Sequence, residues 1–423
     1  MRECKNPAHV SQYDLRAGFG SPQQCYRRKF IKVANHYRLN CSCEIKWLWY
    51  EFRMRLSWRG AALGLALLGM GASPPQIRVA LWKNQARVTV AGEGLTLKFS
   101  DPRYEMIHAQ DASITIVGTT TEFQIGDHTF AERTVSITST SGHLTIDGKK
   151  FKGVLEVQRD PQGKLLVLNQ LDLEDYLVGL VHSEIASTWP AESIKAQAVA
   201  ARTYALFRQK ERAGRDNHYD LESGVEDQVY QGTPHEDPLV EEAVAATQGE
   251  VLWYFGVYPA YFHSCCGGMT ETASHVWDRS DASVAVADPF CQRAPYFHWE
   301  TKISQYDLLK LLWKQGLNGK RIVSMVPIRF DQSPRAETVE IKTDQAALYM
   351  RAVDFRQMLG TQSLRSTWFD VSMGAKDIIF RGTGYGHGVG LCQWGAKGMA
   401  DVGKSYRDIL QFYYPKATLR KVY

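Results

Sequence analysis

Residues 181–206 read VHSEIASTWPAESIKAQAVAARTYAL, and this stretch decides how the second half of the chain is interpreted. It places one acidic residue, Glu184, ahead of a Trp-Pro pair and a long alanine-rich segment. Proline suits the first turn of a helix, where its missing N–H is not needed. Ile194 and Ala198 begin a series of small apolar residues at helical spacing. The pattern predicts a helix over about 190–211 that packs closely against its neighbours.

The segments on either side of this helix indicate an α+β protein. Alternating apolar and polar residues from Ile77 to about Val167, with turn signals such as Asp147-Gly148, predict an antiparallel β region with one solvated face. Helical and strand patterns are then mixed as far as the C-terminus, with few βαβ alternations. We therefore expect a β-rich leading portion over residues 77–165 and a mixed α/β domain over 166–423.

The N-terminal residues have the composition of a leader. Residues 54–60 are basic, residues 61–70 are uncharged and apolar, and small residues follow at 71–73. This order is typical of a cleavable signal peptide, and the apolar run is too short to span a bilayer comfortably. We expect a signal peptide over 54–72 and a spurious or disordered upstream extension over 1–53. A cytoplasmic tail before an uncleaved anchor is the alternative.

The charge distribution argues against nucleic-acid binding. Residues 1–59 contain 12 Lys or Arg and 4 Asp or Glu, whereas residues 60–423 contain 38 and 41. The positive charge therefore belongs to the leader. The rest of the chain has no basic surplus that would attract phosphate groups.

Glu184 is the candidate catalytic acid. It follows the apolar run 176–181 and precedes Trp189. A carboxyl group beside apolar and aromatic residues keeps its proton to higher pH, because desolvation penalises the carboxylate. Such a group can protonate a glycosidic oxygen near neutral pH. A lone glutamate before a helix is otherwise a cap or a solvated side chain, and spacing alone leaves both interpretations open.

Four cysteines remain after the leader: Cys265, Cys266, Cys291 and Cys392. In an exported protein, either of the first two could form a disulfide with either of the others. As a metal site, His263, Cys266, His275 and Cys291 supply suitable ligand types, but no closely spaced pair fixes the geometry. A Cys–His nucleophilic pair is the third interpretation, and nothing in the sequence indicates a lowered thiol pKa.

Residues 382–395, GTGYGHGVGLCQWG, form a glycine-rich stretch near the C-terminal end. Alternating glycines let the backbone come close to a bulky ligand. His387, Gln393 and Trp394 offer hydrogen bonds and a stacking face, which suits sugars. The stretch is not a phosphate-binding loop, because it does not open the helix of a βαβ unit. A tight array of turns with a structural histidine is the alternative.

These stretches together resemble the stage II sporulation protein D family, also described as amidase enhancers. The resemblance covers about residues 165–420. It is carried, in order, by SEIASTWPAESIKAQAVAARTYAL (183–206), DQVYQG (227–232), FHSCCGGMTETASHVW (262–277), DPFCQRAPYFHW (288–299) and GTGYGHGVGLCQWGAKGMA (382–400).

The resemblance implies a peptidoglycan lytic transglycosylase that cleaves MurNAc–GlcNAc bonds of stem-peptide-free glycan strands and forms 1,6-anhydro-MurNAc ends. Glu184 would be the single general acid/base, whereas ordinary glycoside hydrolysis uses a pair of carboxylates. The implied glycan-binding groove would be lined by Arg202, Tyr204, Gln228, Tyr230, His263, Ser264, Gly267, Gly268, Thr270, His387 and Gln393. The alternative is a non-catalytic peptidoglycan-binding module that enhances a partner N-acetylmuramoyl-L-alanine amidase.

The resemblance also bears on cofactors, partners and location. Some relatives hold a structural zinc on the loop over 263–275, but Met269 and His275 stand where zinc ligands would be expected here. A structural zinc therefore stays a possibility without a complete ligand set, no other cofactor is expected, and a zinc amidase in its own right is the weakest hypothesis. We expect glycan strands and a cell-wall amidase as partners, in the periplasm or cell envelope, with no stable membrane span after signal cleavage.

Overall fold

The computed structural model describes residues 73–101, 107–108, 112–214, 218–224, 227–233, 237–277, 279 and 281–423. The signal peptide expected over 54–72 and the upstream extension over 1–53 lie outside the described residues and stay predictions. In the described part of the chain, no helix is long and apolar enough to cross a membrane. Helices and strands both build this part, which confirms the α+β class.

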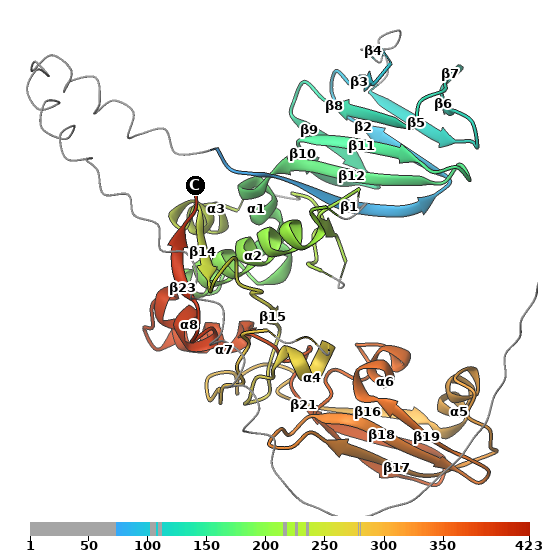
Figure 1. The fold of residues 1–423 in the computed structure, drawn as a ribbon, viewed down its shortest axis with the longest axis vertical. Helices are drawn as coiled ribbons and strands as arrows, with labels where there is room; N and C mark the ends of the chain where they lie inside the picture. Colours follow the sequence, from blue (N-terminus) through green and yellow to red (C-terminus); the bar gives the residue numbers. More distant parts are fainter. Residues whose placement is uncertain are drawn as a thin grey trace, which may run out of the picture. The chain divides into compact units, whose positions relative to one another are not determined.

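The leading part of the described chain is β-rich and forms two sheets (Figure 1). The larger sheet has the strand order β13 (Leu221–Glu222), β1 (Gln76–Gln85), β12 (Leu165–Asp172), β11 (Val154–Arg159), β8 (Thr134–Thr138), β3 (Thr96–Phe99) and β4 (Ile107–His108). The smaller sheet has the order β10 (Lys149–Lys152), β9 (His143–Ile146), β2 (Arg87–Ala91), β5 (Ser113–Gly118), β6 (Phe123–Ile125) and β7 (His128–Phe130). Alternate residues of these strands, such as Val90 and Val135, point into one shared hydrophobic core.

The larger sheet continues past the domain boundary expected at residue 165. Strand β12 pairs antiparallel with both β1 and β11, and β13 adds a parallel edge next to β1. Helix α1 (Leu173–Glu184) follows β12 directly, and its Tyr176 and Leu177 belong to the same core as the strands. The boundary expected at residue 165 therefore falls at the start of a strand of this sheet, and the change from strand to helix comes at Leu173 without a break in the packing.

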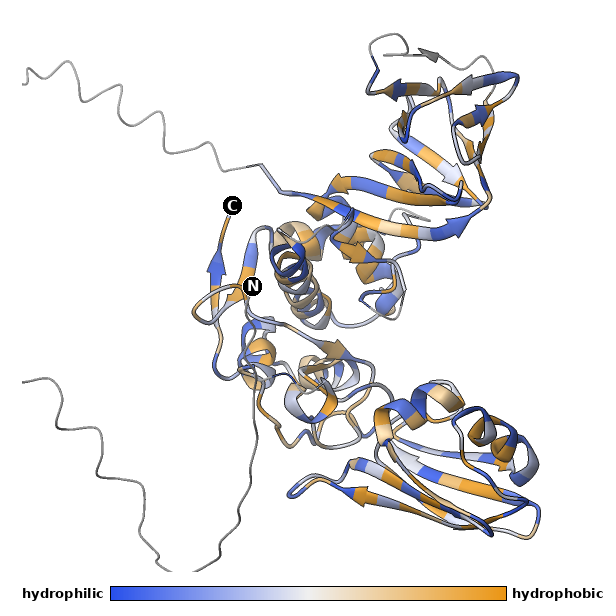
Figure 2. Ribbon diagram, turned by 45° about the vertical axis from the view of Figure 1, so that its right-hand side comes forward, coloured by the Kyte–Doolittle hydropathy of each residue, from blue (hydrophilic) through white to orange (hydrophobic). Residues whose placement is uncertain are grey.

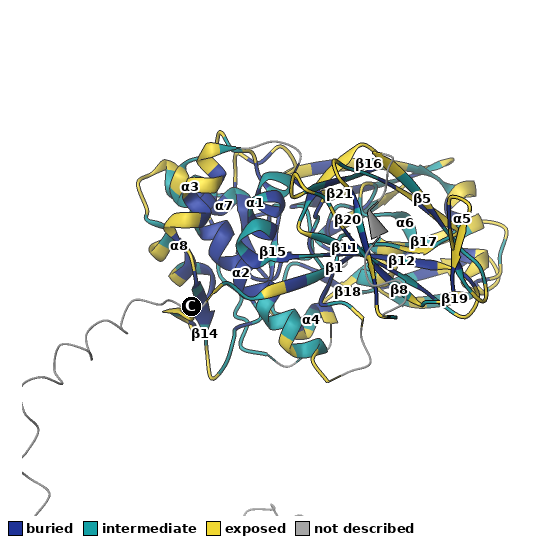
Figure 3. Cartoon of the chain, turned by 90° about the horizontal axis from the view of Figure 1, so that it is seen from above, coloured by how far each residue is buried: buried dark blue, intermediate teal, exposed yellow. Residues whose placement is uncertain are grey.

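Helix α2 (Ala191–Arg212) is the central helix of the described chain, and its bounds agree with the predicted 190–211. Its small residues, including Ala198 and Ala201, have no exposed surface, and Figure 3 shows much of α2 as buried. Small side chains allow close packing of neighbouring helices. The helices in contact with α2 are α1, α3 (Pro238–Ala246), α7 (Gln393–Asp401) and α8 (Tyr406–Tyr413).

Two short strand pairs join the middle of the chain to its C-terminal end. Strand β14 (Glu250–Trp253) pairs antiparallel with β23 (Thr418–Lys421). Strand β15 (Phe262–His263) pairs parallel with β22 (Leu391–Cys392), and helix α4 (Ala273–Trp277) follows β15. These pairings place the 262–277 stretch directly beside the glycine-rich stretch.

Residues 298–383 form a lobe with a hydrophobic core of its own, which the sequence analysis did not separate. One sheet has the order β16 (His298–Ser304), β21 (Asp377–Thr383) and β20 (Phe369–Met373). The other has the order β17 (Ile322–Arg329), β18 (Ala336–Thr343) and β19 (Ala347–Arg351). Helices α5 (Gln305–Lys314) and α6 (Ala352–Leu359) contribute Leu308, Leu312 and Phe355 to this core. Apolar and polar residues alternate along its strands (Figure 2).

Gly382 provides a test of this lobe. It lies opposite Trp299 in the β16–β21 pairing, and a Cβ added at Gly382 would lie 2.1 Å from Cζ2 of the indole ring. We predict that Gly382→Ala destabilises the protein by about 1–3 kcal/mol through overpacking and lowers the Tm measured by calorimetry. Gly256→Ala is the control, because its added Cβ would meet only Lys210 Nζ, at 3.9 Å. Equal Tm values for the two variants would contradict the prediction.

Candidate active site

Glu184 is the last residue of α1, and three distant segments meet at its carboxyl group. The backbone N–H of Val229 donates to Oε1 at 3.1 Å. The side-chain amide of Gln393, the first residue of α7, donates to Oε2 at 3.1 Å. The end of α1, the 227–232 segment and the glycine-rich stretch therefore all contribute to one site.

The environment of Glu184 favours its protonated form. Burial raises the pKa of the Glu184 carboxyl, because desolvation penalises the charged state. The hydrogen bonds from Val229 and Gln393 favour the carboxylate and oppose part of this shift. Glu184 nevertheless keeps part of its surface exposed. A partly exposed carboxyl group with a raised pKa can give a proton to a bound molecule and take one back.

Two tryptophans pack against each other next to this carboxyl group and hold the local chain in place. Trp189, in the turn after α1, packs edge to face against Trp394, with ring centroids 5.0 Å apart. Trp394 directly follows Gln393, and its backbone N–H donates to the carbonyl oxygen of Ser264 at 3.1 Å. The position of Gln393 beside Glu184 is therefore supported from both sides. Both indoles are partly exposed.

His387 is bound to the backbone through both ring nitrogens. Nε2 donates to the carbonyl oxygen of Phe262 at 2.9 Å, and Nδ1 accepts from the N–H of Val389 at 3.1 Å. Burial, with the nearby Arg356, lowers the pKa of His387 to about 3, so the ring is neutral at physiological pH. This geometry favours the structural-histidine interpretation, because neither ring nitrogen is available to move a proton.

His263 lies next to His387, with ring centroids 5.4 Å apart. Its Nδ1 lies 3.1 Å from the carbonyl oxygen of Val389, and burial lowers its pKa well below the usual value. Its Nε2 makes no hydrogen bond with the described residues. The pair of neutral imidazoles therefore supports the turn of the glycine-rich stretch.

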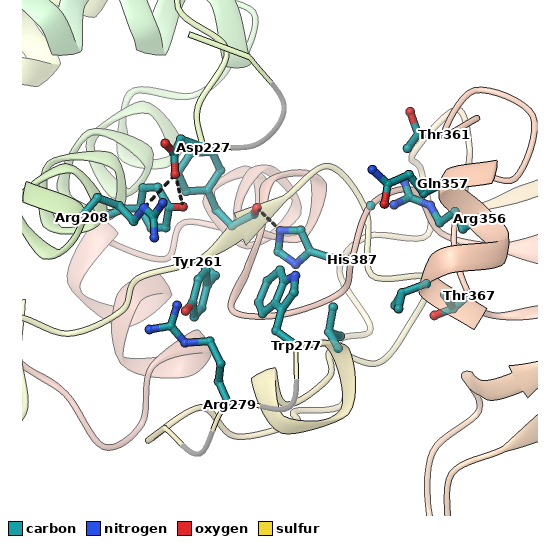
Figure 4. Close-up of a pocket in the computed structure, with 15 residues that line it drawn as sticks. Arg208, Asp227, Tyr261, Trp277, Arg279, Arg356, Gln357, Thr361, Thr367 and His387 are labelled. Atoms are coloured by element: carbon teal, nitrogen blue, oxygen red, sulfur yellow. Dashed lines mark hydrogen bonds and ion pairs between the residues drawn. The ribbon is translucent and has the colours of Figure 1, made fainter. Parts of the chain in front are cut away.

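A cavity of about 510 Å³ opens beside His387 (Figure 4). Its aromatic wall contains Tyr204, Tyr261, Phe262 and Trp277, and its polar wall contains Arg208, Asp227, Arg279, Arg356, Gln357, Thr361 and Thr367. In Figure 4, Tyr261, Trp277 and His387 lie between two groups of polar residues. The Arg208–Asp227 pair is on one side, and Arg356 and Gln357 of α6 are on the other, together with Thr361, which follows α6. Aromatic faces with a few polar groups are a common composition of ligand pockets. Glu184 is not among the residues that line this cavity.

Asp227 positions the segment that contacts Glu184, and the sequence analysis did not identify it. Its carboxylate accepts hydrogen bonds from Tyr204 Oη at 3.1 Å and from Arg212 at 3.1 Å, and it pairs with Arg208 Nε at 2.8 Å. Its side chain is only 1 % exposed. These contacts hold the start of the 227–232 segment against α2, so the Val229 N–H reaches Glu184. A backbone N–H has no sequence signature, which is why this donor could not be found from the sequence.

The structure brings together some residues of the expected groove and separates others. Tyr204 and His387 line the cavity, and Gln393 contacts Glu184. Ser264 is partly exposed and contributes its carbonyl oxygen to Trp394. Gly267 and Gly268 have φ angles of 79° and 110°, a region that other residues rarely adopt. A Cβ at Gly267 would lie within 2.9 Å of Thr383 and Gly384, so Gly267 lets the loop pass close beside the glycine-rich stretch.

Four residues expected in the groove are interior supports, which corrects the expectation drawn from the resemblance. Each has at most 3 % exposed surface, and a side chain without free surface cannot contact a glycan in this conformation. Arg202 forms two hydrogen bonds of 2.8 Å to Glu174. The other three bond internally, Gln228 with Tyr176, Tyr230 with Asn169, and Thr270 with Val286.

The expected zinc ligands do not form one group. Cys266 and Cys291 approach each other, with Sγ atoms 3.5 Å apart. His275 instead contacts Glu271 at 2.8 Å and stacks on Phe330. His263 faces the glycine-rich stretch, as described above. The four cysteines of the described chain are buried free thiols, so the disulfide considered from the sequence is not formed here.

Two family models match different parts of the chain. A family model described as "Stage II sporulation protein" matches residues 161–254, which contain Glu184 and α2. A model described as a domain of unknown function (DUF8618) matches residues 285–390, which contain the separate lobe.

Similar proteins occur in several bacteria. Stage II sporulation protein D of Bacillus subtilis (strain 168) is 30% identical over 264 residues, 58% of this chain and 74% of the relative. An uncharacterized protein of Brachyspira hyodysenteriae is 34% identical over 277 residues, 65% of this chain and 73% of that protein. The amidase enhancer of Bacillus subtilis is 28% identical over 332 residues, 66% of this chain but only 45% of its own length. The chain belongs to the stage II sporulation protein D family.

Arg202 provides a test of the interior supports. We predict that Arg202→Met destabilises the protein by about 3–5 kcal/mol, because it leaves the largely buried Glu174 carboxylate, with 16 % of its side chain exposed, without its ion-pair partner. The matched control is Arg381→Met, since Arg381 and Glu300 are both more than half exposed and such pairs contribute about 0–1 kcal/mol. Denaturant unfolding measures both values. A fully stable Arg202→Met variant that has lost only glycan binding would overturn the supporting role.

Proposed function

We propose that this protein is an exported peptidoglycan lytic transglycosylase. It would cleave MurNAc–GlcNAc bonds of stem-peptide-free glycan strands and leave 1,6-anhydro-MurNAc ends. The observation that carries the proposal is the Glu184 carboxyl group, which has a raised pKa, a partly exposed surface and two hydrogen-bond donors from distant segments.

Glu184 would act first as an acid and then as a base. Its proton passes to the glycosidic oxygen as the bond to the anomeric carbon breaks. The resulting carboxylate takes the proton of the muramic 6-hydroxyl as that oxygen bonds to the anomeric carbon. Burial favours the protonated state before the first step, and the N–H donors of Val229 and Gln393 stabilise the carboxylate between the two steps.

One carboxyl group is sufficient for this reaction, because the substrate supplies the nucleophile and no water has to be activated by a second carboxylate. Asp227 is the nearby acidic residue of the 227–232 segment. It is buried and already engaged by Tyr204, Arg208 and Arg212. It therefore has a supporting role in this proposal and does not act as a second base.

The cavity beside His387 would bind a part of the glycan away from the broken bond. Tyr261 and Trp277 supply aromatic faces, with ring centroids 4.6 Å apart. Gln357 and Arg356 supply polar groups on the opposite wall. We assign it to a flanking sugar because Glu184 does not line it.

A second candidate function is a non-catalytic peptidoglycan-binding module that stimulates a partner amidase. The observation that favours it is the relative whose name is "Amidase enhancer". The same cavity would then hold glycan without cleavage, and Glu184 would be dispensable for the stimulating effect.

The transglycosylase and the non-catalytic binding module are distinguished by an experiment in which amidase-stripped glycan strands are digested with wild type and with Glu184→Gln. We expect Glu184→Gln to lower the rate at which anhydro-muramic ends form by about 100-fold or more, as for loss of a general acid, and mass spectrometry measures the product. Glu241→Gln, an exposed residue of α3, is the matched control and should keep full activity. Equal amounts of anhydro-muramic product from wild type and Glu184→Gln would rule out the catalytic role of Glu184. No product from wild type, with stimulation of an added amidase, would establish the second function.

The pH dependence of stability provides an independent test of the Glu184 environment. Its folded-state pKa is raised, so the contribution of its proton to stability is complete below the unfolded pKa of about 4.3 and is lost as the pH rises through the folded pKa. We therefore expect Glu184→Gln to have a higher Tm than wild type at pH 8 and a similar Tm below about pH 4. Calorimetry across this range measures the difference. A lower Tm for Glu184→Gln at pH 8 would show that the carboxylate is the form stabilised by the fold.

A further inference from the structure

Four groups that commonly bind metal ions converge in the interior of the described chain, one of them from the glycine-rich stretch. They are the thiols of Cys266, Cys291 and Cys392 and the carboxylate of Asp288, and one ligand atom from each lies within 4.8 Å of all the others. Sγ of Cys266 lies 3.5 Å from Sγ of Cys291 and 3.1 Å from Oδ2 of Asp288. None of the four residues has exposed surface.

We propose that Cys266, Cys291, Cys392 and Asp288 form a structural zinc site. Tetrahedral Zn²⁺ with Zn–S distances of about 2.3 Å places its sulfur ligands about 3.8 Å apart, close to the spacing found here. A disulfide would instead require about 2.05 Å between two sulfurs. Four protein ligands in a fully buried position leave no place for water or substrate, which is the mark of a structural and not a catalytic zinc.

The backbone around the cluster is arranged to stabilise thiolates. Sγ of Cys392 accepts the N–H groups of Cys266 at 3.2 Å and Gly395 at 3.3 Å. Sγ of Cys266 accepts the N–H of Gly268 at 3.4 Å. Cys392 is also the N-cap of α7, where the helix dipole favours negative charge. Three donors aimed at sulfur are expected for thiolates, and buried thiolates need a cation nearby.

The charge balance of the surroundings also suits a metal–thiolate centre. Three thiolates and one carboxylate around Zn²⁺ leave a net charge of −2. Arg335 has only 1 % exposed surface, and its Nη2 donates to the carbonyl oxygen of Cys266 at 2.8 Å. Its Nε and Nη1 make no hydrogen bond with the described residues. The positive charge of this buried guanidinium would therefore compensate part of the negative charge of the metal–thiolate centre.

Asp288 is oriented as a ligand by its own hydrogen bonds. Its Oδ2 accepts from the Tyr413 hydroxyl at 2.9 Å, and its Oδ1 accepts from the Phe290 N–H at 2.9 Å. Such outer contacts commonly fix the carboxylates that bind metals. Cys265 is adjacent in sequence and also buried, and its thiol contacts those of Cys291 and Cys392, although it is not one of the four groups that lie within 4.8 Å of one another. Cys265→Ser therefore tests whether this thiol is a ligand in place of Asp288, and Cys41→Ser is the control.

The proposed site would join three segments that also shape the surroundings of Glu184. Cys266 comes from the 262–277 stretch, Asp288 and Cys291 from 288–299, and Cys392 from the glycine-rich stretch. Cys392 immediately precedes Gln393, which contacts Glu184. Zinc would thus fix the start of α7. The site rests on the cluster alone and does not depend on the transglycosylase activity.

The experiment measures zinc bound to the purified full-length chain by elemental mass spectrometry. We expect one zinc per chain in wild type, with loss of that zinc in Cys291→Ser and Asp288→Asn. Cys265→Ser should retain it, and so should Cys41→Ser, which tests the upstream cysteines. Wild type without zinc, or with Cys266 and Cys291 joined in a disulfide on peptide mapping, would overturn the site. Loss of zinc in Cys265→Ser with retention in Asp288→Asn would overturn the ligand set.

A second measurement keeps the test informative if a variant fails to fold. Wild type reconstituted with Co²⁺ should show thiolate-to-metal charge-transfer absorption, which needs no substitution. A chelator should lower the Tm of wild type and of Cys265→Ser by a similar amount. A wild-type Tm unchanged by chelator, with no charge-transfer absorption from Co²⁺, would reject the proposal.

Discussion

The rest of the site depends on the balance at one carboxyl group. Removing Glu184 from water favours its neutral form, while the N–H groups of Val229 and Gln393 favour its charged form. Neither donor is near Glu184 in the sequence. The balance therefore exists only if α1, the 227–232 segment and the start of α7 keep their relative positions to within the length of a hydrogen bond.

Buried polar contacts behind the surface hold these positions. Arg202 joins α2 to Glu174 at the start of α1, and Asp227 joins the 227–232 segment to α2. Each is a charged group without free surface, and an unpaired charge in such a place is costly. These contacts therefore specify one arrangement of the helices strongly, which explains how residues in family motifs can support a site without touching a ligand.

The described chain combines two packing units that serve one cavity. The helical part supplies Tyr204, Asp227 and the aromatic wall, whereas α6 of the separate lobe supplies Arg356 and Gln357. That lobe has its own core and its own family match over 285–390. The cavity composition is therefore a property of both units, and differences in the lobe would change what the cavity binds without changing the surroundings of Glu184.

Much of the fold could be predicted from the sequence, because the decisive signals are local. Alternation of apolar residues marked strands such as β2, β8 and β11, and the alanine series with Pro190 marked α2. Glu184 became a candidate because it follows the apolar run 176–181 and precedes Trp189, but only the family resemblance singled it out. The lobe over 298–383 was not separated, because its strands and helices look locally like those before them.

The sequence by itself determined the α+β class and the central helix, since these follow from the spacing of neighbouring residues, whereas the expectation of a single acid at Glu184 came from the family resemblance. Only the tertiary structure decided that Arg202, Gln228, Tyr230 and Thr270 are internal supports, that a backbone N–H of Val229 reaches Glu184, and that Asp288 and Cys392 join Cys266 and Cys291. The physical reason is that burial and hydrogen-bond partners are set by segments far apart in the chain. No local pattern carries that information.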